Sequence, residues 1–78
     1  GDSWFGEDSK SLGLVSGSSV GHSSVVGEGA TVTNSVILDY AEVGAGSILD
    51  ECLIGRGARI PKGTVMNGKI VGHDSHLG

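Results

Sequence analysis

Three histidines are the residues of this 78-residue chain best suited to acid–base or metal chemistry. The imidazole ring changes charge near neutral pH and binds metals through either nitrogen. His73 and His76 flank Asp74 in GHDSH and are candidate ligands for zinc or iron, with a third ligand expected from another subunit. The simpler interpretation is a solvated polar corner. We therefore predict no catalytic residue, no resident metal and no cofactor in this chain.

Acidic residues and one thiol are the other groups with chemical potential. Asp39, Glu42, Asp50 and Glu51 are crowded into one coil of the repeat. Two carboxylates close together can act as a general acid and a general base. These four acids fall in different outward columns of the repeat described below, so we expect ordinary solvated acids. Cys52 has no histidine near it in the sequence to act as a base, and we expect an unreactive thiol.

A repeat of 17 residues must position all of these side chains. Aliphatic residues recur at intervals of six, six and five, as in Val20, Val26, Val32, then Ile37, Val43, Leu49, then Ile54, Ile60, Met66. A spacing of six matches neither the helical period nor a long alternating strand. It indicates very short strands joined by corners, three to a coil, with glycine supplying the permissive backbone at many corners.

A second patterned position follows each aliphatic residue by four. Small residues such as Ala30 and Ser47 occupy it in the six-residue units, and Val36, Leu53 and Ile70 occupy it in the five-residue units. We predict that these residues, like the aliphatic ones, point into a triangular core.

The start of the chain departs from this register, which would require an aliphatic residue where Ser9 stands. We therefore divide the chain into residues 1–14, a non-repeat leader or an N-terminal cap that includes Trp4 and Phe5, and residues 15–78, the β-helix.

The repeat units resemble those of the hexapeptide-repeat family, as in VGEGAT, VGAGSI, IGRGAR and IPKGTV. This resemblance implies a left-handed parallel β-helix, an exception to the usual right-handed crossover. With NSVIL and ECLIG between them, the units are most similar to the C-terminal β-helix of sugar-phosphate nucleotidyltransferases, such as the mannose-1-phosphate guanylyltransferases and glucose-1-phosphate adenylyltransferases. In that family an N-terminal domain with a GxGxRL-type loop performs the chemistry, and this sequence contains no such loop.

Two functions follow from the resemblance. The first is a non-catalytic oligomerisation or regulatory β-helix domain of a sugar-phosphate nucleotidyltransferase, whose activity would belong to a parent protein. Because the chain begins without methionine and ends inside a coil, we expect it to be part of such a parent. The alternative is a small hexapeptide acyltransferase, or a metalloenzyme like the γ-class carbonic anhydrases, with a site shared between subunits around His73 and His76.

Outward apolar residues predict a partner surface made of Val25, Leu38, Tyr40, Ile48 and Val65. Ile48 stacks beneath Val65 in the repeat, and a contiguous apolar patch marks an interaction site. So short a chain has little core of its own. We predict a homo-oligomer, or stacking on a parent catalytic domain.

Charge and composition narrow the partners further. Asp39 with Arg56, and Glu42 with Arg59, place opposite charges one coil apart and predict surface ladders. A net charge of −4 argues against nucleic acid. No apolar run reaches the roughly 18 residues of a membrane span, and a single cysteine suits a reducing compartment. We predict a cytoplasmic protein without nucleic-acid or membrane partners.

Overall fold

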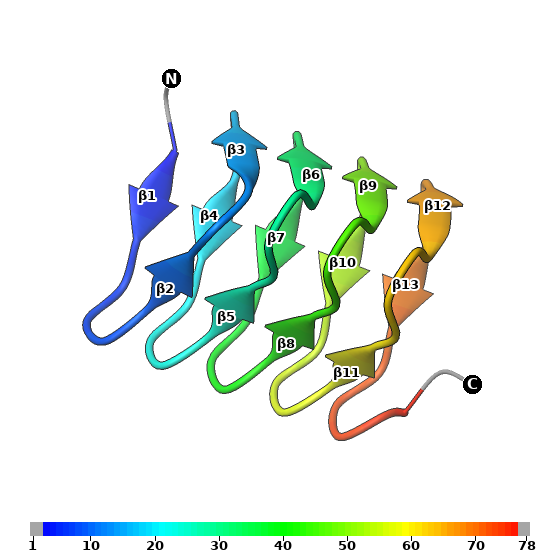
Figure 1. The fold of residues 1–78 in the computed structure, drawn as a ribbon. Coiled ribbons are helices and arrows are strands. Elements are labelled where there is room, and N and C mark those ends of the chain that lie inside the picture. The colour runs from blue at the N-terminus through cyan, green and yellow to red at the C-terminus, as the bar shows by residue number, and fades with distance from the viewer. Residues whose placement is uncertain (1–2, 77–78) are drawn as a thin grey trace.

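The chain folds into a stack of short parallel strands that wind in the left-handed sense around a triangular core (Figure 1). A computed structural model describes residues 3–76, which contain strands and turns but no helix. Accordingly, no helix in this range could cross a membrane. The strands are β1 (Trp4–Phe5), β2 (Lys10–Ser11), β3 (Leu14–Ser16), β4 (Ser19–Val20), β5 (Val25–Val26), β6 (Thr31–Thr33), β7 (Val36–Ile37), β8 (Glu42–Val43), β9 (Ile48–Asp50), β10 (Leu53–Ile54), β11 (Arg59–Ile60), β12 (Val65–Asn67) and β13 (Ile70–Val71).

Every third strand joins the same sheet, so each sheet forms one side of the triangle. Sheet A has the order β1-β4-β7-β10-β13, sheet B the order β2-β5-β8-β11 and sheet C the order β3-β6-β9-β12. Paired residues lie 17 positions apart from β4 onward, as in Val20, Ile37 and Ile54 of sheet A. The predicted left-handed parallel β-helix of hexapeptide units, with 17-residue coils, is confirmed.

The core consists of aliphatic columns, one on the inner side of each sheet. Their buried members are Val20, Ile37, Ile54 and Val71 in sheet A, Val26, Val43 and Ile60 in sheet B, and Val32 and Leu49 in sheet C. Because parallel register stacks equivalent positions directly, each of these side chains packs against the ones above and below it. Burial of each such side chain contributes roughly 1.5–3 kcal/mol relative to leaving it in water.

The structure contradicts one part of the predicted core. Val36, Leu53 and Ile70 face outward and are 41%, 37% and 78% exposed. The five-residue unit lacks one corner residue, so the position four after the aliphatic residue already lies on the next strand. There it directly precedes an inward residue such as Ile37, and adjacent residues of a strand point to opposite sides.

Residues 3–16 form a first coil in register with the rest, and the boundary proposed at residue 15 falls inside β3. This coil is two residues shorter than the others, because Ser11 pairs with Val26, 15 positions on, whereas Val15 pairs with Val32, 17 positions on. The short corner requires glycine at position 13, where a Cβ would collide with the carbonyl oxygen of Ala30. Counting by 17 therefore selected Ser9 in place of Ser11.

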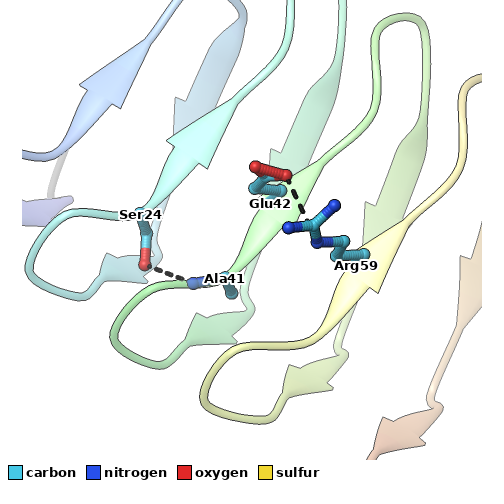
Figure 2. Close-up of polar contacts among 4 residues, drawn as sticks. All are labelled: Ser24, Ala41, Glu42 and Arg59. Atoms are coloured by element: carbon cyan, nitrogen blue, oxygen red, sulfur yellow. Dashed lines mark hydrogen bonds and ion pairs between the residues drawn. The ribbon is translucent and has the colours of Figure 1, made fainter. Parts of the chain in front are cut away.

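Small polar side chains fill the inner corners and hold neighbouring coils together. Between sheets C and A, the Ser18 hydroxyl accepts a hydrogen bond from the backbone N–H of Ser35 at 3.0 Å, and the Ser35 hydroxyl accepts one from that of Cys52 at 3.0 Å. Between sheets A and B, Ser24 accepts from the N–H of Ala41 at 3.1 Å (Figure 2). Within residues 3–76, every buried side-chain nitrogen or oxygen has a hydrogen-bond partner.

Ser35→Ala removes a buried acceptor and leaves the N–H of Cys52 without its partner. We expect the free energy of unfolding to fall by about 1–3 kcal/mol, measured by urea denaturation. Ser19→Ala is the matched control, since Ser19 lies on the outer side of β4 beside the inward Val20. Equal losses in the two variants would contradict the role of the inner hydroxyl.

Cys52→Ser should raise the free energy of unfolding, whereas Ser35→Ala should lower it. The thiol donates only a long hydrogen bond, 3.4 Å to the carbonyl oxygen of Asp50, and sulfur is a weak acceptor. A hydroxyl there repeats the geometry of Ser35 and offers an acceptor to the N–H of Lys69. We expect the same urea measurement to show a gain of about 0.5–1.5 kcal/mol; a lower midpoint would overturn this account.

Candidate interaction surface

The outer surface has three flat sides, and direct stacking turns each outward column into a ladder. Ladder A, on sheet A, consists of Trp4, Ser19, Val36, Leu53 and Ile70. Ladder B, on sheet B, consists of Lys10, Val25, Glu42, Arg59 and His76. Ladder C, on sheet C, consists of Leu14, Thr31, Ile48 and Val65. Two sides are therefore mainly apolar and one is charged.

Ladders A and C expose large apolar side chains at most levels of the stack. On sheet C, Leu14, Ile48 and Val65 are 74%, 48% and 71% exposed. On sheet A, Trp4 is also exposed, with its ring edge against the ring of His22 at a centroid distance of 5.6 Å. The apolar side chains are adjacent from Val36 to Ile70 on ladder A and from Ile48 to Val65 on ladder C, and a contiguous apolar patch marks an interaction site.

The structure separates the five residues predicted to form the partner surface. Ile48 and Val65 are neighbours on ladder C. Val25 is half-buried on ladder B, whereas Leu38 and Tyr40 lie on the corner between sheets A and B. The predicted set is thus distributed over three parts of the surface.

Sequence reasoning missed ladder A, whose apolar members were assigned to the core or to the leader. A usable signal was present, because Val36, Leu53 and Ile70 each directly precede an inward aliphatic residue. Two-residue alternation within the short strand places such a residue outside.

The charged side carries one ion pair, Glu42 Oε2 to Arg59 Nε at 3.7 Å (Figure 2). Both side chains are more than half exposed, so the pair contributes at most about 1 kcal/mol. Beside it lies an open groove of about 480 Å³, whose lining includes Val25, Lys62 and His76.

The three histidines lie apart, and two of them serve as acceptors for the backbone of a neighbouring coil. His73 lies on the corner between sheets A and B, where its Nδ1 accepts a hydrogen bond from the N–H of Arg56 at 2.9 Å. His22 makes the same contact three coils earlier in the same corner column, with Nδ1 accepting from the N–H of Glu7 at 2.7 Å. His76 pairs with Arg59 on ladder B. In residues 3–76, no three His, Cys, Asp or Glu side chains gather as a metal site.

The acidic residues also serve the backbone and neighbouring side chains. Asp39 Oδ1 accepts from the N–H of His22 at 2.8 Å. Asp50 accepts from the Thr33 hydroxyl at 2.7 Å and from the Asn67 amide at 3.1 Å. These carboxylates stabilise the stack one coil at a time, and they do not converge on a common point.

Comparison with protein-family models gives a match to most of the chain. A family model described as "GlmU-like, C-terminal hexapeptide" matches residues 7–77. No curated protein matches the chain. The match spans nearly the whole repeat and includes part of the short first coil.

His73→Ala should weaken the stack through loss of a backbone cap. We expect unfolding free energy to fall by about 0.5–1.5 kcal/mol, measured by urea denaturation. His73→Asn is the control, because a side-chain oxygen can accept the same bond, as Asp39 does for His22. If both variants lost equal stability, the Nδ1 contact would not be the cause.

Proposed function

Because this chain belongs to the GlmU-like C-terminal hexapeptide family, we propose that it is a non-catalytic oligomerisation or regulatory β-helix domain of a sugar-phosphate nucleotidyltransferase type protein. Its partner is a second copy of the chain or a parent catalytic domain. A reducing compartment, the cytoplasm, suits its one buried free thiol, Cys52.

Ladders A and C are the observation that carries this proposal. Leu53 and Val65 represent two mainly apolar columns, which lie on separate sides of the stack. Water-exposed aliphatic and aromatic residues in continuous register favour burial against another surface. A small solenoid has few other sources of stabilisation, so association supplies burial that the core alone cannot.

The polar groups support a structural role as well. His73, Asp39 and Ser35 each accept a hydrogen bond from the backbone of a neighbouring coil. These bonds give each of the three side chains a structural role between coils. In this proposal, any chemistry belongs to a parent domain.

A second candidate is a small hexapeptide acyltransferase with a site shared between subunits. The groove beside ladder B favours it, because His76 lies there together with Arg59 and Lys62. Acyl transfer from acetyl-coenzyme A that disappears in His76→Ala would support this candidate. Stoichiometric zinc or iron that is lost in His73→Ala would instead favour a metal-dependent enzyme.

The proposed role predicts that apolar ladder residues control association. Leu53→Lys and Val65→Lys place a charge on ladders A and C, and we expect each to lower the molecular mass found by sedimentation at micromolar concentration. Leu12→Lys is the matched control, since Leu12 is 55% exposed but lies on neither ladder. A wild-type chain that sediments as a stable monomer would refute association through the ladders.

A further inference from the structure

One edge of the β-helix carries a pattern that neither apolar ladder includes. It lies where sheet A turns into sheet B, and it spans two successive coils. We call it the edge patch, formed by Asp39, Tyr40 and Glu42 on one coil and by Arg56, Gly57 and Arg59 on the next.

Register places these residues in three matched columns. Glu42 and Arg59 are paired across β8 and β11. Tyr40 and Gly57 share the corner position at which the backbone has positive φ, 62° and 70°. The Gly57 N–H donates to the carbonyl oxygen of Asp39 at 2.9 Å, which fixes the two corners one above the other. In two of these columns an acidic side chain in the first coil lies next to a basic one in the second. In the third column the tyrosine lies next to glycine.

The tyrosine is unusual for its position. The left-handed backbone region disfavours bulky side chains, and this corner position holds Ser23 and Asp74 in other coils. Tyr40 nevertheless occupies it, with 63% of its surface exposed. The neighbouring coil has Gly57 at the same position, so that coil has no side chain of its own beside the protruding ring, and the Asp74 carboxylate lies where a Cβ of residue 57 would be.

We propose that a second copy of this chain binds the edge patch in antiparallel orientation, about a two-fold axis perpendicular to the stack and located between these two coils. That axis exchanges the two coils. It sets Asp39 opposite the partner's Arg56 and Glu42 opposite the partner's Arg59. It also sets the Tyr40 ring over the partner's Gly57, and the reverse contacts follow by symmetry.

Charge selects this orientation over the parallel one. A two-fold axis along the stack would set each coil against its own copy, with Asp39 opposite the partner's Glu42 and Arg56 opposite the partner's Arg59, and like charges at an interface are costly. The whole chain shows the same bias. Four of its five Lys and Arg lie after residue 54, whereas eight of its nine Asp and Glu lie before residue 55. Antiparallel copies bring the acidic part of one beside the basic part of the other.

The contacts within one chain leave these groups able to bind a partner. The Glu42 and Arg59 side chains are 51% and 63% exposed although they form an ion pair. A guanidinium has five N–H donors and a carboxylate has two acceptor oxygens, so each can bind a second counterpart. At Gly57, the place of a side chain is taken by the Asp74 carboxylate, which offers an acceptor for the hydroxyl of the partner's Tyr40.

Complementary charge reversal tests the proposal. The variant Asp39→Arg/Glu42→Arg makes the patch entirely basic, and Arg56→Asp/Arg59→Glu makes it entirely acidic. We expect each variant alone to sediment at half the mass of the wild-type assembly, because identical charges then meet. An equimolar mixture of the two variants should regain the wild-type mass. Restoration by mixing distinguishes contacts between chains from the pairs within a chain.

Glu28→Lys/Glu51→Lys is the matched control, since it makes the same charge change on the other two corners and should keep the wild-type mass. A second measurement needs no substitution: the wild-type mass should fall by half when sodium chloride is raised from about 0.05 to 1 M. Reversed variants with wild-type mass, or a mixture that stays at the lower mass, would overturn the antiparallel contact. This contact uses neither ladder A nor ladder C, so its failure and that of the proposed function are distinguishable.

Discussion

Backbone hydrogen bonds between successive coils hold every part of this molecule in place. Strands such as β4, β7 and β10 exchange them in parallel register, with N–H to carbonyl distances of 2.7 to 3.0 Å between coils. A residue therefore always lies next to the residue one coil away. Any property of a position, whether apolar, charged or small, becomes a column that runs along the stack, and the core and the outer ladders are both consequences of this rule.

The same rule determines what polar side chains do. Ser35, Asp39 and His73 each lie within hydrogen-bond distance of a backbone N–H in an adjacent coil. At a corner the backbone N–H has no carbonyl of a neighbouring strand to bond. A side-chain acceptor takes the place of that carbonyl, and leaving a backbone N–H unpaired away from water costs free energy. Residue types that suggest catalysis or metal binding in a sequence thus act here as connectors between coils.

The outside of the stack differs in chemistry between two of its sides and the edge between sheets A and B. Ladders A and C, represented by Leu53 and Val65, are apolar and suited to burial. The edge patch, represented by Tyr40, combines charge with a protruding ring and suits a contact that specifies orientation. Burial supplies most of the free energy of association, whereas charge decides which arrangement forms. A short solenoid can therefore associate through its sides and still be oriented by one edge.

The sequence alone determined the β-helix, its 17-residue coil and most of its inward columns, because a period of six with aliphatic residues has few other structural solutions. It also indicated Ile48 beneath Val65 as a surface pair. Only the tertiary structure decided the side on which Val36 lies and the true partner of Ser11. Both depend on how many residues each corner uses, and corner length is set by backbone geometry such as the close approach at Gly13. The structural role of His73 also depends on the tertiary structure, since its hydrogen-bond partner is the backbone of another coil.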